Sequence, residues 1–472
     1  MSMQAPHGYQ SIVDLSEELR RPTKTLLALA AANDPFFADR FGRLQDAEWF
    51  AELWDRFKFG PGIHLRRIHY ILISQATPII LPGDINYANI ADCWVRLIRA
   101  SRDARYLKLV PIEYFDDRRS DKVHEFLAAG REAVLLVDEP NRLAPDLSLL
   151  RIDAQLGEPP DFSFHRPAIA QRYHVELWAE KTTENETLLD LAEQYALNVT
   201  TAPGEISLTR CHQLVERAKA SERPVRILYI SDFDPAGMSM PVACARKIEF
   251  LIRNDDLDLD IQVRPIVLTH DQCTHYRLPR TPIKETERRG SAFEERFGEG
   301  ATELDALEAL HPGELRRLLE IEIARYYDAD LDNRVAEEGD SFDDELRHIR
   351  RQVLERHEAK LAAVREDYEQ LVRRINADIK EIANRYSTPF KKIADRSNRL
   401  QAKIAGELEA EAPDPDLVDW PEPDEGDEDD DPLFDSTRDY VEQIDRFKRH
   451  QGKRTARKTR KDKGVRRNGG ES

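Results

Sequence analysis

The chain has 472 residues, which is enough for two or three domains. Hydrophobic residues make up 40% of it and support a buried core, but 34% of the residues are charged, so we expect part of the chain to stay outside any core. The formal net charge of −19 would ordinarily exclude a nucleic-acid partner, but the charge is unevenly distributed. No run approaches the roughly 18 apolar residues of a membrane span, and no secretion signal is visible, so we expect a cytoplasmic protein without membrane contact.

The first 57 residues form a predicted amino-terminal helical region, with helices over Ser11 to Phe57. Residues 58–160 are predicted to form a winged-helix-like DNA-binding domain. Its expected elements are helices over His64–Ile73 and Tyr87–Arg99, a short strand over Leu109–Tyr114, and a helix and a strand (133–137) between Lys122 and about Asp161.

Basic residues gather on the exposed side of these predicted elements. Phosphate contacts dominate the affinity of proteins for DNA, so such a cluster predicts a double-stranded DNA partner. The candidate DNA contacts are Arg66, Arg67, Arg102 and Arg105, with Arg99, Lys108, Arg118 and Arg119 close to them in sequence.

Residues 161–335 alternate between strand and helix patterns. The expected strands are His174–Ala179, Asn198–Thr201, Val225–Ile230 and Ile261–Leu268, and the helices between them are Glu184–Ala196, Leu208–Lys219 and Met238–Ile252. Arg277 to Glu299 is expected to be a long loop, and Ala301 to Tyr327 to be helical. This order predicts an α/β fold with a Rossmann-like parallel sheet whose strands end at one edge.

Acidic residues follow two of these strands. Glu180 and Lys181 end the first strand, and Asp232 and Asp234 end the third. Because parallel strands end at one edge, the three carboxylates are expected in one crevice, where they would bind Mg²⁺ and position a scissile phosphate. Solvated acids that cap the following helices are the alternative. Lys181 is either a phosphate contact or a surface lysine.

These strand ends resemble the Toprim domain, in which one strand ends in Glu and another in Asp-x-Asp. The stretch Asp232-Phe233-Asp234-Pro235-Ala236-Gly237 is similar to the Asp-x-Asp-Pro-x-Gly form of the topoisomerase VI A subunit and the related meiotic double-strand-break protein. Arg66-Arg67-Ile68-His69-Tyr70 is similar to the segment that ends in the family's nucleophilic tyrosine, with His69 in place of a first tyrosine. Glu303 to Leu307 resembles the family's acidic-hydrophobic segment, and the whole resemblance covers roughly Phe59 to Tyr327.

The resemblance implies a DNA-cleaving transesterase of the type IIB topoisomerase class, with Tyr70 as the nucleophile and Glu180, Asp232 and Asp234 as Mg²⁺ ligands. A phenol ordinarily has a pKa near about 10, so a nucleophilic Tyr70 needs neighbouring cations such as Arg66 and Arg67. The resemblance also implies a homodimer in which the tyrosine of one protomer acts with the metal of the other. No Gly-x-x-x-x-Gly-Lys-[Ser/Thr] motif occurs, so an ATPase would be a separate chain.

Other functions stay open. Tyr70 could simply pack, and Tyr87 is a neighbouring alternative for the nucleophile. A metal-dependent Toprim nuclease without tyrosine chemistry, like the nuclease subunit of plasmid-defence complexes of the Wadjet type, is the main alternative. A phosphatase of the haloacid dehalogenase type also has Asp-x-Asp after a strand, but expects Thr or Val where Ala236 stands. The last alternative is a non-catalytic DNA-binding scaffold.

The carboxyl-terminal third is predicted to form a long helix followed by charged tails. Within residues 336–406, an apolar seam predicts a helix over Ser341–Tyr386. This helix is either a coiled-coil arm on a dimer or a helix folded back on its own domain. The seam residues are Leu361, Val364, Tyr368, Leu371, Ile375, Ile379, Ile382 and Tyr386. Residues 407–472 are predicted to be disordered. Glu407 to Asp431 carries 14 acidic residues and no basic one, and Arg446 to Arg467 carries 12 Lys and Arg against one Asp. The basic tail is predicted to be a non-specific DNA tether for which the acidic run competes; two mutually neutralising tails are the alternative.

Overall fold

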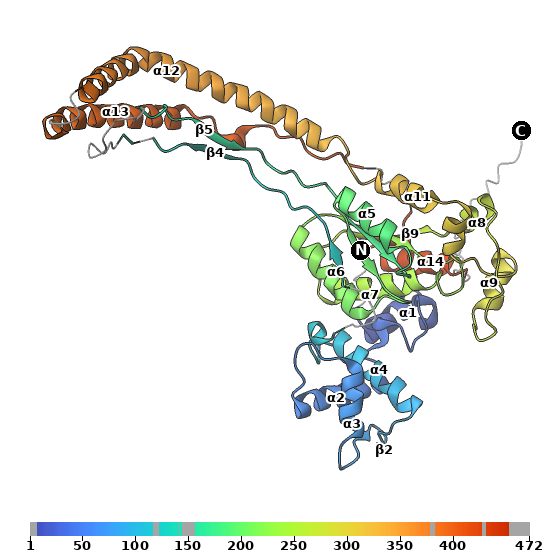
Figure 1. The fold of residues 1–472 in the computed structure, drawn as a ribbon. Coiled ribbons are helices and arrows are strands. Elements are labelled where there is room, and N and C mark those ends of the chain that lie inside the picture. The colour runs from blue at the N-terminus through green and yellow to red at the C-terminus, as the bar shows by residue number, and fades with distance from the viewer. Residues whose placement is uncertain are drawn as a thin grey trace, which may run out of the picture. The chain divides into compact units, whose positions relative to one another are not determined.

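The computed structural model describes residues 7–116, 122–140, 142–143, 156–377, 383–426 and 431–452. The chain forms two compact units, of which the first contains Met1–Ala128, Arg172–Tyr327 and Glu425–Ser472 (Figure 1). The second unit contains Ala129–Gln171 and Asp328–Asp424. The boundaries expected at residues 160 and 335 therefore differ from those observed, because the second unit is assembled from two segments that are far apart in sequence.

A six-stranded sheet forms the centre of the first unit, in the order β10-β9-β8-β6-β7-β3. Its four central strands run parallel, as expected from the sequence: β9 (Ile261–Val267), β8 (Val225–Ile230), β6 (His174–Ala179) and β7 (Asn198–Thr201). Antiparallel edge strands complete the sheet, namely β10 (Phe434–Asp435) and β3 (His124–Glu125). Every residue of β6 and β8 is buried, including the polar His174 and Glu176 of β6 and Arg226 of β8.

Helices cover both faces of this sheet. In β8, Ile227 and Tyr229 belong to the core beneath α6 (Leu208–Ser221) and α7 (Met240–Asn254), whereas Leu228 and Ile230 belong to the core on the opposite face. That opposite face is covered by α5 (Asn185–Tyr195) and α11 (Glu314–Ile323). Alternate residues of one strand thus pack into two different cores, one on each face of the sheet. This defines a three-layer α/β arrangement.

The segment after β9 is more helical than expected. It contains α8 (His270–His275), α9 (Gly290–Phe297) and α10 (Asp305–Leu310). The expectation of a loop over Arg277 to Glu299 holds as far as Arg289 but is wrong for α9, because Phe293 of α9 is buried and packs on Phe233, with ring centroids 5.1 Å apart. This packing holds α9 next to the loop that follows β8.

The amino-terminal part of the first unit is mostly helical. It contains α1 (Tyr9–Glu18), 3₁₀ helices η1 (Thr23–Leu26) and η2 (Pro35–Phe37), α2 (Phe41–Phe57), α3 (Leu65–Ile73), the hairpin of β1 (Ile80–Leu81) and β2 (Ile85–Asn86), and α4 (Ala91–Tyr106). The strand expected over Leu109–Tyr114 is wrong, since Pro111 instead leads into the 3₁₀ helix η3 (Ile112–Tyr114). The described residues from Lys122 to Val134 also lack the expected helix, because His124 and Glu125 pair with β7 as strand β3. Arg118 and Arg119 lie outside the described residues.

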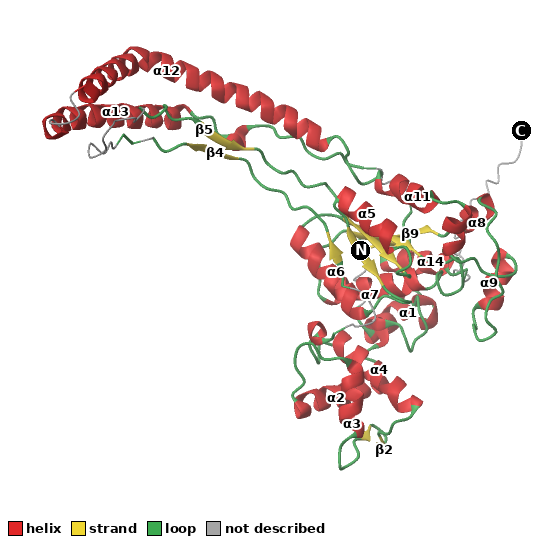
Figure 2. Ribbon diagram, in the orientation of Figure 1, coloured by secondary structure: helices red, strands yellow, loops and turns green. Residues whose placement is uncertain are grey.

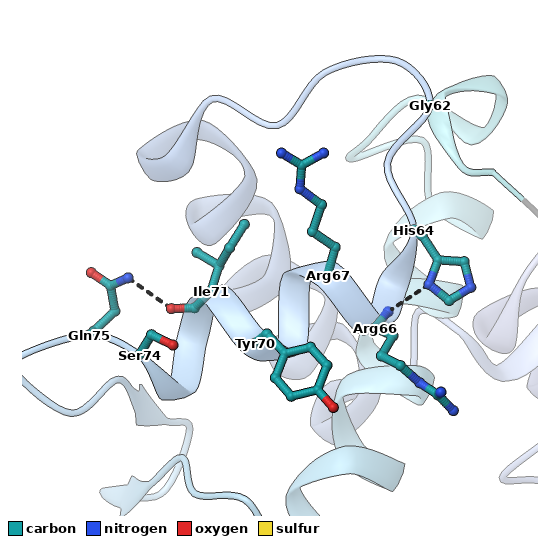
Figure 3. A pocket seen from close by; sticks show the side chains of 8 residues that line it. All are labelled: Gly62, His64, Arg66, Arg67, Tyr70, Ile71, Ser74 and Gln75. Carbon is teal, nitrogen blue, oxygen red and sulfur yellow. Dashed lines mark hydrogen bonds between the residues drawn. The ribbon is translucent and has the colours of Figure 1, made fainter.

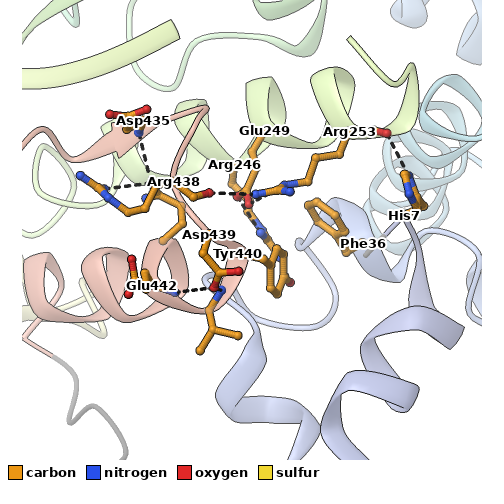
Figure 4. Close-up of polar contacts among 12 residues, drawn as sticks. His7, Phe36, Arg246, Glu249, Arg253, Asp435, Arg438, Asp439, Tyr440 and Glu442 are labelled. Carbon is orange, nitrogen blue, oxygen red and sulfur yellow. Dashed lines mark hydrogen bonds and ion pairs between the residues drawn. The ribbon is translucent and has the colours of Figure 1, made fainter. Parts of the chain in front are cut away.

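The predicted disordered tail is partly folded. Strand β10 and helix α14 (Tyr440–His450) belong to the first unit, where Ile444 and Phe447 are fully buried. In Figure 4, Arg246 of α7 lies beside Phe36 and reaches Tyr440, whose hydroxyl accepts a hydrogen bond from Arg246 Nη2 at 2.6 Å. The prediction of disorder over residues 407–472 is thus wrong for this stretch. The remainder of the basic tail, residues 453–472, lies outside the described residues.

The second unit combines a hairpin with a pair of long helices (Figure 2). The hairpin consists of β4 (Val134–Val137) and β5 (Phe162–His165), and the helices are α12 (Leu331–Ala377) and α13 (Ala383–Glu411), followed by the 3₁₀ helix η4 (Pro415–Leu417). Tyr368, Leu371 and Ile375 of the predicted seam pack against Phe390 and Ala394 of α13, so the same chain covers this part of the seam. Ile379 and Ile382 lie outside the described residues. No described helix is long and apolar enough to cross a membrane.

Candidate acidic site at the strand ends

The site is built where β6 and β8 end side by side. Ala179 pairs with Ile230 in the parallel register, and the backbone N–H of Glu180 donates a hydrogen bond to the carbonyl oxygen of Ile230 at 3.1 Å. Glu180 and Asp232 therefore leave adjacent strands at one edge of the sheet. The structure thus brings together the acidic residues that the sequence predicts at these strand ends.

A tight loop presents the two aspartates. The carboxylate of Asp234 accepts a hydrogen bond from the backbone N–H of Gly237 at 2.5 Å, and Oδ1 of Asp232 accepts one from the N–H of Leu304 at 2.7 Å. A Cβ atom on Gly237 would lie 2.1 Å from the carbonyl oxygen of Asp232, so only glycine fits there. Phe233, between the two aspartates, is buried and anchors the loop in the core.

Lys181 crosses this acidic edge. Its ammonium group lies 2.9 Å from Asp232 Oδ2, 2.5 Å from Glu303 Oε2 and 3.7 Å from Asp305 Oδ2. Burial opposes the charge of Lys181, but the hydrogen bonds to Glu303 and Asp232 outweigh it and raise its pKa above the ordinary value. Glu303 and Asp305 lie in the acidic-hydrophobic segment noted in the sequence, and the structure places both at the same edge.

Burial and neighbouring negative charge perturb the acids at this edge. Burial, together with the neighbouring charges of Asp232 and Asp234, raises the pKa of Glu180 to about 7. Burial likewise raises the pKa of Asp232, against the effect of its hydrogen bond from Leu304 and of Lys181. The Oε2 atom of Glu180 is buried and has no hydrogen-bond partner among the described residues. Negative charge at this edge is therefore only partly compensated by the chain's own groups.

The residues fit a hard divalent cation by their chemistry. Among the described residues, no group of three or more His, Cys, Asp or Glu side chains is already arranged as a metal site. Lys181 supplies the positive charge that Asp232 and Glu303 share in this arrangement. The unpartnered oxygen of Glu180 and the raised pKa of that residue are nevertheless what Mg²⁺ would relieve, since it binds carboxylate oxygens.

One cation near the site was missed by the sequence analysis. Arg289 donates a hydrogen bond to Ser239 Oγ, at the start of α7, and is held by Glu287 with two bonds of 2.7 Å. The hydrogen bonds that Arg289 donates to Glu287 raise the pKa of Arg289, and the charge of Asp234 adds to this shift. The segment was expected to be a loop, and only the Arg288-Arg289 pair in its sequence could have suggested a site residue.

Tyr70 lies in a separate pocket of about 620 Å³ on α3. Figure 3 shows Tyr70 and Arg66 projecting from the same side of the helix, one turn apart, whereas Arg67 projects from another side. The Tyr70 side chain is 57% exposed. Across the described part of the chain, no hydrogen bond or ion pair connects Tyr70 with Glu180, Asp232 or Asp234, so these predicted site residues form two distinct places within one chain.

Tyr87 has a different environment from Tyr70. It is 4% exposed, and its hydroxyl lies 2.6 Å from Nδ1 of the buried His69. Burial, and the charge of Cys93, raise the pKa of Tyr87 far above the ordinary value. Of the two tyrosines, Tyr70 is therefore the one that an external phosphate could reach.

Two of the arginines predicted to bind DNA make contacts within the chain. Arg102 pairs with the buried Asp103 at 3.2 Å and donates a hydrogen bond to the carbonyl oxygen of Ala32 at 2.8 Å. The Arg105 guanidinium lies over the ring of Phe115, 4.4 Å from its centroid. DNA binding by these two arginines stays a prediction, whereas Arg66 and Arg67 line the exposed pocket of Tyr70.

Comparison with known proteins adds no relative to these observations. No model of a known protein family matches the chain, and no curated protein sequence matches it significantly.

Proposed function

We propose that the protein cleaves DNA strands in a Mg²⁺-dependent reaction, with a Toprim-like site in its first unit. The observation that carries this proposal is that Glu180 and Asp232 follow adjacent parallel strands, where burial and the neighbouring charges of Asp232 and Asp234 raise the pKa of Glu180 to about 7. Carboxylates are costly to crowd together unless a cation compensates them, and perturbed acids in such places mark functional sites.

Glu180, Asp232 and Asp234 would hold the Mg²⁺ ion, which supplies positive charge to a phosphodiester and helps to orient it. The chain's own groups have separate tasks. Lys181 and Arg289 provide cations for non-bridging phosphate oxygens, and the N–H groups of Leu304 and Gly237 fix the orientation of the two aspartates. Asp234 and Asp232 are thereby aligned before any ligand arrives.

Tyr70 is the proposed nucleophile. Its hydroxyl oxygen forms a bond to phosphorus, a bond from phosphorus to a deoxyribose oxygen breaks, and the departing oxygen takes up a proton. Arg66, one turn away on the same side of α3, would favour the phenolate form and contact the phosphate. Because Tyr70 and the acidic edge are separate places in one chain, we propose that a dimer combines Tyr70 of one protomer with the acids of the other.

Hydrolysis without tyrosine is the second candidate. The separation of Tyr70 from the acidic edge favours it, since a single protomer then has the metal ligands without the nucleophile. In that case water attacks the phosphodiester, and a free phosphate end results. The amino-terminal helices with Arg66 and Arg67 serve DNA binding in either reaction, and an ATPase partner is required only for strand passage.

Cleavage of supercoiled plasmid in Mg²⁺ tests the proposed function. Glu180→Gln and Asp232→Asn should lose cleavage by about 100-fold or more while they still bind DNA. Glu216→Gln, an exposed acid paired with Lys219 on α6, is the matched control and should cut like the parent protein. Equal cutting by all four proteins would overturn the site assignment. Protein recovered on the cut ends of the parent, but absent with Tyr70→Phe, distinguishes the tyrosine reaction from hydrolysis.

A further inference from the structure

We infer that the pocket around Tyr70 binds one unpaired nucleotide of a DNA strand, with its base on the Tyr70 ring and its phosphate at Arg66 and Arg67. The inference rests on the proposed function, because it takes DNA as the ligand, and it adds the form of DNA that the protein selects. It applies to both proposed reactions, since stacking uses the face of the Tyr70 ring and leaves the hydroxyl accessible.

The charged groups of the pocket favour an anion. None of the eight residues that line it is acidic, and two of them are arginines. On the neighbouring helix α4, Arg96 is neutralised by Asp46 at 2.6 Å. Among the described residues, by contrast, neither Arg66 nor Arg67 has an ion-pair partner. Two guanidinium groups without an internal counter-ion suit the phosphate of a ligand.

The size and the apolar wall of the pocket fit a base in addition to a phosphate. Its volume of about 620 Å³ lies within the range of about 300 to 1,000 Å³ that is typical of small-ligand sites. A phosphate alone would leave most of this space empty. The Tyr70 ring, 57% exposed, and the aliphatic side chain of Ile71 line the same pocket. An aromatic ring that is free on one side is a stacking platform for a base.

The Tyr70 ring has a fixed neighbour on α3. The ring of His69 lies 5.7 Å from it, between centroids, and is itself buried. Nδ1 of His69 lies 2.6 Å from the hydroxyl oxygen of Tyr87, which is also buried. The support of the Tyr70 ring is therefore rigid, so less conformational freedom is lost when a base stacks on it.

Both a hydrogen-bond donor and an acceptor are available for the edge of a base (Figure 3). Nδ1 of His64 accepts a hydrogen bond from the backbone N–H of Arg66 at 3.2 Å, which leaves Nε2 as the donor nitrogen of the neutral ring. Nε2 of Gln75 donates to the carbonyl oxygen of Ile71 at 2.8 Å, which leaves Oε1 as an acceptor. A paired base turns its edge toward its partner and its faces toward the stack. Only an unpaired base can therefore use both the ring and the polar groups of this pocket.

The first test compares two duplexes that differ only at one bulged position, by fluorescence anisotropy in EDTA. The bulge is a thymidine in one duplex and, in the other, an abasic residue that keeps the sugar and the phosphate. The parent protein should bind the thymidine bulge at least about 5-fold more tightly, because only this bulge offers a base for stacking. Equal affinities for the two bulges would overturn the inference, and so would equally tight binding of a fully paired duplex.

Three variants assign this preference to the Tyr70 ring. Tyr70→Ala should bind both bulges with equal affinity, whereas Tyr70→Phe should keep the preference because phenylalanine retains the stacking face. Phe41→Ala is the matched control, since it removes a 75% exposed aromatic side chain that does not line the pocket, and it should keep the preference of the parent. A preference retained by Tyr70→Ala, or lost in Tyr70→Phe, would overturn stacking on this ring.

The two arginines are tested by the salt dependence of binding. Arg66→Gln and Arg67→Gln should each make the slope of log affinity against log salt shallower by about 0.9, since each variant loses one phosphate contact. The affinity ratio between the two bulges should stay that of the parent, because other groups hold the base. Lys219→Gln, which changes an exposed lysine of α6, is the control and should keep the parent's slope. Unchanged slopes in both arginine variants would overturn the phosphate position.

Further outcomes separate this inference from a different ligand and from the proposed function. Displacement of the thymidine bulge by free thymidine 5′-monophosphate at about 10 µM or below would assign the pocket to a free nucleotide and overturn the DNA ligand. A parent protein that prefers the thymidine bulge but cuts no DNA in Mg²⁺ would support the pocket and refute the proposed cleavage. A parent protein that cuts DNA but does not distinguish the two bulges would overturn the pocket and leave the cleavage standing.

Discussion

The ammonium group of Lys181 lies 2.9 Å from Oδ2 of Asp232, so one cation joins the ends of β6 and β8. The same group reaches Glu303 at 2.5 Å. Lys181 thus balances part of the charge that Glu180, Asp232 and Asp234 bring to this edge, and a bound Mg²⁺ ion must share these carboxylates with it.

Replacing Lys181 with glutamine should increase the stabilisation by Mg²⁺. Without the ammonium group the carboxylates repel one another more strongly, and the metal no longer competes with an internal cation. The melting temperature should be lower than that of the parent in EDTA, and Mg²⁺ should raise it by more than it raises that of the parent. Lys219→Gln, which removes an exposed pair with Glu216, is the control. An equal Mg²⁺ response in all three proteins would contradict competition at this edge.

The raised pKa of Glu180 makes the stability of the folded protein fall as the pH rises. Its carboxyl pKa is about 7 in the folded protein and 4.5 ordinarily, so between these values the folded state binds more protons than the unfolded state. The stabilisation from the protonated carboxyl is present below pH 4.5 and is lost as the pH rises through 7. Glu180→Gln keeps the shape without the charge and should exceed the parent in stability at pH 8 by on the order of 1 kcal/mol, a value reduced for partial exposure. Denaturant titrations in EDTA at pH 5 and pH 8 measure this; a variant less stable than the parent at pH 8 would refute it.

Gly237 is required by the shape of the aspartate loop. Gly237→Ala would set its Cβ 2.1 Å from the Asp232 carbonyl oxygen, so the loop must move and the Asp234 hydrogen bond is lost. We expect a destabilisation of about 2 kcal/mol or more. Gly42→Ala on α2 should be neutral or slightly stabilising, because no described atom outside the local helix backbone lies within 4 Å of the added carbon. Thermal unfolding of both variants measures the difference, and equal melting temperatures would show that the loop is not tight.

Because α14 is packed in the core, truncation before it and truncation after it should give chains of very different stability. A chain ending at Asp439 lacks Phe447 and Ile444 and exposes the core beneath them, so it should be insoluble or unfold well below the parent. A chain ending at Gly452 should melt like the parent. Tyr440→Phe removes the hydroxyl that joins Arg246 to the carbonyl oxygen of Leu26 and should cost about 1–3 kcal/mol. Parent-like stability of the chain ending at Asp439 would show that α14 is dispensable.

Local pattern was sufficient to predict the parallel strands of the first unit. β6 and β8 consist mostly of apolar residues, as strands buried on both faces require, and their parallel order alone implied that Glu180 meets Asp232. The helical seam at Tyr368 and Leu371 was also visible.

Contacts between distant segments could not be predicted in this way. Tyr440, Ile444 and Phe447 have helical spacing, but they lie between acidic and basic runs whose composition indicated disorder. The core that α14 joins is formed by the sheet edge, α7 and the amino-terminal segment around Phe36. The covering of the seam by α13 is a contact between two helices, which the residue spacing within one helix does not specify. Arg289 approaches the aspartate loop only because Phe293 anchors α9.

The most direct test of the central claim is Mn²⁺ binding, measured by electron paramagnetic resonance without DNA. Mn²⁺ prefers the same carboxylate ligands as Mg²⁺, and its free ion is easily quantified. The parent and the Glu216→Gln control should bind the ion equally, whereas Glu180→Gln and Asp232→Asn should bind it at least about 10-fold more weakly. Equal Mn²⁺ binding by all four proteins would contradict a metal site at the ends of β6 and β8.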